Sequence, residues 1–325
     1  MPVAGAIPEL IVTVDPPDHT RLRKLVAPAF ASRRIAATRP RIEQVSEELL
    51  DTMAAGGPPA DLVAEYAIPL PLTIICELLG VPYGDRVRFS QWVGATLSSP
   101  DRTADEVRAA AARLMAYLAE LIDVKRRKPA EDLLGGLIRA RDGGDRLSDD
   151  EMVGFAVGLL VAGYETTASE LAHGVLLLLR HPGQLAALRD DPARLPVAVE
   201  EVLRCVPLSN GLAAIRIATE DVELGGVVVR AGEAVLPLTA SANRDRDVFT
   251  EPERFDLTRA PNPHLAFGHG VHHCLGAQLA RLELTVGIAA LLRRFPGLRL
   301  AVDDEDLTWK PAMALNVLAA LPVAW

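Results

Sequence analysis

Cysteine, membrane-length apolar runs and a secretory leader are scarce or absent in this sequence. The three cysteines among 325 residues are odd in number and widely spaced, which argues against a disulfide framework and favours a reducing compartment. The longest apolar run, residues 152–163, is far shorter than the ~20 residues that a membrane span needs. The first residues, MPVAGAIPEL, lack the basic start and the apolar core of a signal peptide. We therefore expect a cytoplasmic protein that does not associate with a membrane.

An excess of positive charge is missing as well. The formal net charge is −9, which argues against a nucleic-acid partner. No internal repeat, low-complexity tract or convincing linker divides the chain. Because 50% of the residues are hydrophobic, the chain can bury a sizeable core. We expect residues 1–325 to form a single domain.

Helical spacing dominates what the sequence does contain. Leu, Ala, Glu and Arg recur at helical intervals along most of the chain. Strand-like stretches are confined to about residues 213–240 and to the last few tens of residues. The pattern predicts a fold that is mainly α with a small β component.

One long helix is expected over residues 149–180. Ser148, followed three residues later by Glu151, forms a capping box that marks its start. Its first half is apolar on all sides, which is typical of a helix buried in a large core. The segment AGYETT, residues 162–167, then places a carboxylate and two hydroxyls in this apolar run. Since apolar helical sequence continues beyond it, we expect a functional polar break in the helix, with Gly163 leaving room beside it.

The segment HLAFGHGVHHCLG, residues 264–276, holds the densest group of possible metal ligands. Zinc fits poorly, because the adjacent His272, His273 and Cys274 cannot easily converge on one tetrahedral ion. A cysteine nucleophile beside a histidine is conceivable, but nothing in the sequence indicates its oxyanion hole. The third interpretation is a single thiolate as the axial ligand of a haem iron, with the glycines wrapping the backbone around the sulfur.

The residues of this loop resemble a known family. FGHGVHHCLG, residues 267–276, resembles the haem-binding loop of the cytochrome P450 enzymes. The resemblance implies that Cys274 ligates the iron of haem b. It implies further that the haem is bound by four other residues of the loop: Phe267, Gly268, His272 and Gly276. The segment DPPDHTRLR resembles the one that supplies partners for the haem propionates, with His19 and Arg23 in those positions, and Arg216 occupies a third. With His272 of the loop, these would be four partners of the two haem carboxylates.

The long central helix carries a second resemblance. AGYETT resembles the oxygen-activating segment of the family, with Glu165 and Thr166 in the positions of the catalytic acid and alcohol. Ala162 and Gly163 would then lie beside the haem.

EEVLR resembles the Glu-x-x-Arg motif of the family, which implies a buried ion pair between Glu201 and Arg204. Helical periodicity alone does not choose between two partners for Arg204, because Glu201 lies three residues before it and Glu200 four. The resemblance favours Glu201.

The resemblance covers essentially the whole chain and fits the soluble bacterial branch. It implies a monooxygenase that activates O2 and hydroxylates or oxidatively couples a hydrophobic organic substrate, either a free small molecule or one bound to a carrier, in secondary metabolism. Since no GxGxxG or flavin motif is present, electrons would come from a ferredoxin and a ferredoxin reductase. Two alternatives stay open: a catalytically inert helper subunit of another enzyme, and a haem enzyme driven by peroxide.

One departure from the family concerns the N-terminal side. The propionate-binding segment begins at Asp15, so we expect a P450 fold that lacks much of the usual N-terminal portion. We expect either a second chain, including another copy of this one, or a large substrate to cover the β segments near residues 227–229 and 235–238, unless the chain is simply shortened. Ser209 and Asn210 are expected as polar contacts in a hydrophobic substrate pocket.

Overall fold

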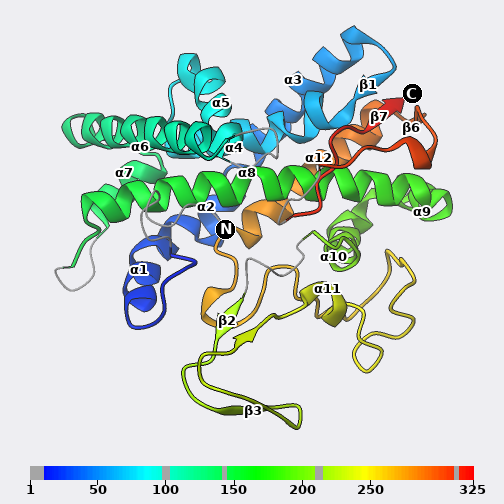
Figure 1. The fold of residues 1–325 in the computed structure, drawn as a ribbon. Helices are drawn as coiled ribbons and strands as arrows, with labels where there is room; N and C mark the ends of the chain where they lie inside the picture. Colours follow the sequence, from blue (N-terminus) through cyan, green and yellow to red (C-terminus); the bar gives the residue numbers. More distant parts are fainter. Residues whose placement is uncertain (1–10, 97–102, 141–144, 209–214, 311–314) are drawn as a thin grey trace.

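The computed structural model describes residues 11–96, 103–140, 145–208, 215–310 and 315–325 (Figure 1). The described helices are α1 (Asp18–Val26), α2 (Ser32–Ala36), α3 (Arg39–Gly56), α4 (Pro69–Leu79), α5 (Arg86–Thr96), α6 (Ala104–Arg127), α7 (Leu133–Arg139), α8 (Asp149–Arg180), α9 (Pro182–Asp190), α10 (Leu195–Cys205), α11 (Thr239–Ala242) and α12 (Ala277–Arg294). The described strands are β1 (Ala60–Asp61), β2 (Arg216–Ile217), β3 (Val222–Leu224), β4 (Val227–Val229), β5 (Ala234–Val235), β6 (Arg299–Leu300) and β7 (Pro322–Ala324). The prediction of a mainly helical protein with a small β component is confirmed.

Helix α8 begins and ends where the sequence predicts. The Glu151 N–H donates to the Ser148 hydroxyl (3.2 Å), and the Ser148 N–H donates to the Glu151 carboxylate (2.7 Å), which completes the capping box. By length and hydropathy alone α8 could cross a membrane, but 61% of its most apolar window is buried inside the fold. That burial is what a core helix requires, so its apolar character is explained by packing.

The polar segment of α8 does not interrupt the helix, so that prediction is wrong. Residues 162–167 are α-helical like the rest of α8, and the Thr166 hydroxyl donates to the Ala162 carbonyl one turn back. The expected room beside Gly163 is partly filled, because a Cβ there would lie 3.6 Å from the Ile75 side chain. A hydroxyl satisfied within its own helix allows α8 to remain regular.

The helices pack around α8, which crosses the whole width of the molecule (Figure 1). Helices α4 and α6 contact it, as do α10 and α12. Gly174 permits the close approach of α10, because a Cβ at this position would lie 2.8 Å from Val202 Cγ1. This contact fixes α10, and with it Glu201 and Arg204, against the central helix.

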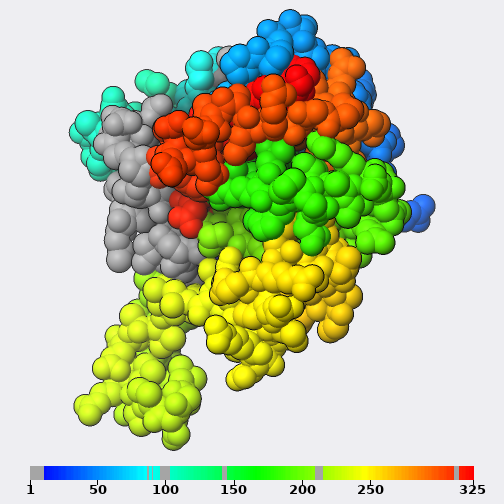
Figure 2. All heavy atoms as spheres, turned by 90° about the vertical axis from the view of Figure 1, so that its right-hand side faces the viewer, coloured from blue at the N-terminus to red at the C-terminus, as the bar shows by residue number. Residues whose placement is uncertain are grey.

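The strands form three small antiparallel sheets, in the orders β1–β7–β6, β2–β5 and β3–β4. Strand β1 lies outside both regions in which strands were predicted. The sequence does not indicate this strand, because its two residues are too few to give a periodic signal. The β3–β4 hairpin turns at Gly225 and Gly226, whose φ angles of 58° and 81° suit a tight hairpin turn. The segment that carries it projects from the body of the protein (Figure 2). Val227 and Val228 on this hairpin are 65% and 59% exposed.

Candidate active site

The loop around Cys274 is shaped by its own backbone. The Cys274 N–H donates to the Phe267 carbonyl (2.9 Å), which closes the loop on itself. Gly268 and Gly270 have φ angles of 71° and 75°, a conformation that glycine adopts without strain. The loop places the Cys274 side chain, which is exposed, just before the first turn of α12.

The electrostatic surroundings of the Cys274 thiol act in opposite directions. Desolvation by the surrounding loop raises the pKa of this thiol above its ordinary value, whereas the Gly276 and Ala277 N–H groups, Arg23 and Arg281 lower it. The two N–H groups belong to the start of α12, the end of a helix that stabilises negative charge. The net effect is a raised pKa, so these groups offset only part of the desolvation of a thiolate, and a cationic iron at the sulfur would supply the rest.

Three of the four residues predicted to bind haem propionates lie together beside this loop. The His19 ring is 4.2 Å from the His272 ring between centroids, and Arg23 Nη2 donates to the His273 carbonyl (2.7 Å). His19 is only 2% exposed, and neither of its ring nitrogens has a hydrogen-bond partner among the residues that the structure describes. Burial, His272 and Arg23 lower the pKa of His19. A buried imidazole without partners beside an exposed thiol fits a haem carboxylate, which would supply the missing acceptor.

Arg216, the fourth predicted partner, lies exposed on β2, where its guanidinium donates to the Ile215 carbonyl (3.3 Å). Among the described residues, no group of three or more His, Cys, Asp or Glu side chains is placed to share a metal ion. Ser209 and Asn210, the expected polar contacts of the substrate pocket, lie outside the described residues.

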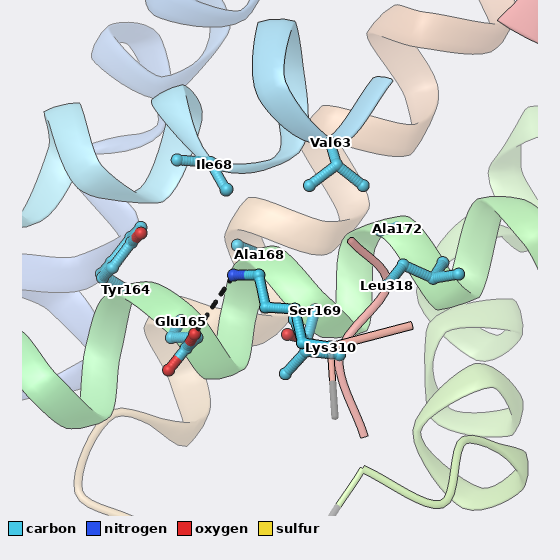
Figure 3. A pocket seen from close by; sticks show the side chains of 10 residues that line it. Val63, Ile68, Tyr164, Glu165, Ala168, Ser169, Ala172, Lys310 and Leu318 are labelled. Carbon is cyan, nitrogen blue, oxygen red and sulfur yellow. Dashed lines mark ion pairs between the residues drawn. The ribbon is translucent and has the colours of Figure 1, made fainter. Parts of the chain in front are cut away.

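Glu165 and Thr166 leave α8 in different directions. Glu165 is 6% exposed and lies 3.7 Å from Lys310 Nζ across a small pocket (Figure 3). Burial raises the pKa of Glu165, and Lys310 opposes that rise. Thr166 is partly exposed, beside the exposed Ala162. The acid and the alcohol are therefore adjacent in sequence without being hydrogen-bonded to each other.

Lys310 is a residue that sequence reasoning missed. It lies between β6 and β7, 145 positions from Glu165 along the chain. Its segment carries no motif, so only the folded structure brings the ammonium to the carboxylate (Figure 3).

Glu201 and Arg204 form the predicted ion pair. Arg204 Nε and Nη2 each donate to a Glu201 oxygen at 2.8 Å, and both side chains are fully buried. The same guanidinium donates to three backbone carbonyls, those of Asn243 (2.9 Å), Pro252 (2.7 Å) and Arg254 (3.1 Å). The pair thus ties α10 to the irregular segment that precedes the cysteine loop.

Glu200, the other candidate for Arg204, has different partners. Arg281 Nε and Nη2 donate to its two oxygens at 2.7 and 2.9 Å, and His264 Nε2 lies 3.0 Å from one of them. Although burial raises the pKa of Glu200, His264 and Arg281 lower it to about 2. Sequence reasoning missed Arg281, which follows Cys274 by seven residues and lies on α12.

Comparison with known proteins defines the class. The family described as "Cytochrome P450" matches residues 88–310. Nocardicin C N-oxygenase from Nocardia uniformis subsp. tsuyamanensis is 53% identical over 315 residues, which cover 97% of this chain and 79% of the relative. The crystal structure of the LnmA cytochrome P450 hydroxylase, from the leinamycin biosynthetic pathway of Streptomyces atroolivaceus S-140, is similar with a TM-score of 0.94 and 51% identity, and the match covers 97% of this chain and 81% of that one.

This chain therefore belongs to the cytochrome P450 family and has its mainly helical fold. It is a bacterial cytochrome P450 monooxygenase, and its close relatives are hydroxylases and oxygenases of secondary metabolism. The family implies a haem–thiolate cofactor and electrons from redox partner proteins. A more distant similar structure, P450BioI in complex with an acyl carrier protein ligated to hexadec-9Z-enoic acid, has a TM-score of 0.89 and 37% identity, with 97% of this chain and 81% of that chain covered.

Proposed function

We propose that this protein is a cytoplasmic, single-domain haem b monooxygenase in which Cys274 is the protein ligand of the iron. The observation that carries the proposal is an exposed thiol just before α12 together with a buried His19, which packs on His272 of the same loop and whose ring nitrogens have no partner in the described part of the chain. His19, Arg23 and His272 would hold the propionates, joined by Arg216. When bound, a haem with a thiolate ligand supplies binding and cleavage of O2.

The remaining residues would bind, orient and supply protons. Phe267 and the loop glycines Gly268 and Gly276 would shield the sulfur from water. On α8, Ala162 and Gly163 would face the haem, and Thr166 Oγ1 would hand over the proton that O–O cleavage consumes. Glu165 is not hydrogen-bonded to Thr166, so it would resupply that proton through water, and burial, which raises the pKa of its carboxyl, favours the protonated form that this role needs.

The substrate would be a hydrophobic organic molecule that is hydroxylated or oxidatively coupled, either free or attached to a carrier. Relatives of secondary metabolism support the first form, and the similarity to a P450 bound to an acyl carrier protein supports the second. A ferredoxin and its reductase would supply the electrons, since the sequence has no GxGxxG or flavin motif of its own.

A carbon monoxide difference spectrum of the reduced protein tests the central assignment. Cys274→Ala should abolish the band that is characteristic of a thiolate ligand, together with monooxygenase activity. Cys76→Ala and Cys205→Ala are matched controls, because both of these thiols are buried whereas Cys274 is exposed, and both variants should keep the band. A thiolate spectrum that persists in Cys274→Ala would refute the proposal.

A further inference from the structure

Arg281 stands between a carboxylate and an aromatic ring next to the cysteine loop. Its guanidinium carbon lies 4.5 Å from the centroid of the Phe267 ring, and two of its nitrogens are held by Glu200. The ring belongs to the residue whose carbonyl accepts the Cys274 N–H. A chain of direct contacts thus runs from Glu200 on α10 through Arg281 on α12 to the loop.

This arrangement fixes both the plane and the position of the cation. A bidentate fork holds a guanidinium more rigidly than a single contact would, and a flat guanidinium over a ring face is a favourable geometry. His264 contacts the same carboxylate, so Glu200 is held from two sides. Lysine could supply the charge at this position but neither the fork nor the stacking plane.

The contact with Phe267 also places the charge of Arg281 near the sulfur. The guanidinium is held against the residue whose carbonyl accepts the Cys274 N–H, and a positive charge held there favours negative charge at the thiolate. Reduction of the site by one electron also adds negative charge without forming or breaking a bond. The positive charge of Arg281 must therefore favour the reduced state of the site. A group that moves Arg281 away or neutralises its charge must favour the oxidised state.

We propose that Arg281 is a positioning residue that sets how readily the site accepts an electron, and that Glu200 moderates this effect by partly neutralising Arg281. The proposal rests on Cys274 as the haem ligand. The electron would come from a reduced one-electron carrier such as a ferredoxin, which is oxidised in the same step. No proton transfer is required.

The midpoint potential of the haem-loaded full chain, measured by spectroelectrochemistry, tests this. Arg281→Gln should make reduction harder by roughly tenfold in the equilibrium constant, equivalent to ~59 mV for one electron. Glu200→Gln should shift the potential in the opposite direction, because the cation is then unopposed. Arg281→Lys should lie between wild type and Arg281→Gln. Arg294→Gln is the matched control, since Arg294 lies on the same helix and pairs with Asp51 on the surface (3.0 Å).

The opposite signs separate this role from a purely structural one. If Arg281 only stabilised the fold, Arg281→Gln and Glu200→Gln would both lower thermal stability, and their potentials would match that of Arg294→Gln. Equal potentials, or shifts of the same sign, would overturn the proposal. If Arg281→Gln fails to fold, Arg281→Lys and Glu200→Gln still decide the sign. A wild-type protein without the thiolate carbon monoxide band would instead overturn the proposed function.

Discussion

Replacing Arg204 by Met should destabilise the protein far more than removing an exposed arginine. The change leaves the Glu201 carboxylate buried with weaker compensation from Arg259, whose Nε lies 3.1 Å away, and it leaves three backbone carbonyls without this donor. Breaking a buried pair from one side costs about 3–5 kcal/mol. With about 2.1 cal/mol/K of unfolding entropy per residue, a chain of 325 residues should lose about 4–7 °C in Tm.

The chain offers a matched control for this measurement. Arg194 and Asp191 form a pair with the same spacing of three residues (2.9 Å), but their side chains are 50% and 48% exposed. Arg194→Met should cost no more than ~1 kcal/mol, because exposed pairs contribute little. Thermal and denaturant unfolding followed by circular dichroism would compare the two variants. Equal losses of stability would refute the reasoning that burial makes the Arg204 pair important.

Three further predictions concern protons and electrons. Thr166→Ala should raise peroxide release relative to product while haem is retained, as judged by the absorption spectrum; equal coupling in this variant would transfer the role to Thr167 or to water. A carboxyl whose pKa is higher in the folded state stabilises the fold only while protonated, so Lys310→Met should make the unfolding free energy fall more steeply as pH rises above the ordinary Glu165 value of 4.5. The added loss should not exceed ~1 kcal/mol, because Lys310 is 37% exposed, and an unchanged pH profile would rule the pair out. Arg33 on α2 is exposed and could contact an acidic ferredoxin, so Arg33→Glu should slow reduction by ferredoxin, and less so at high salt. Reduction rates that change neither with the substitution nor with salt would exclude a role of Arg33 in docking.

The sequence predicts best what local interactions decide. The start of α8 follows from Ser148 and Glu151, which contact each other within one turn, so no distant residue has to be known. The grouping of His19, Arg23 and His272 was predicted from the family resemblance, because positions 19 and 272 are too far apart for any local rule. Without the resemblance, each of these residues would have been read as an ordinary surface side chain.

The choice between Glu200 and Glu201 shows where local rules stop. Both carboxylates lie within helical reach of Arg204, and what separates them is the packing of α10 against other segments. Arg281 donates hydrogen bonds to Glu200, whereas the Asp256 N–H and Arg259 donate to Glu201. Lys310 was missed for the same reason, because its contact with Glu165 also depends on the packing of distant segments. The predicted break in α8 is absent, because the Thr166 hydroxyl bonds to the Ala162 carbonyl within the helix and the buried Glu165 carboxylate has Lys310 beside it.

The segment between α11 and the cysteine loop contains little regular structure, yet buried polar groups hold it. The Asp256 N–H donates to the buried Glu201 (2.9 Å), and the Leu265 N–H donates to Asn243 Oδ1 (2.7 Å). Amide hydrogen exchange follows the opening of such contacts, whether or not they belong to helices. These two amides should therefore exchange with deuterium as slowly as those in the middle of α10. The segment and α10 should open as one cooperative unit, so that exposing the cysteine loop from this side requires unfolding part of the core.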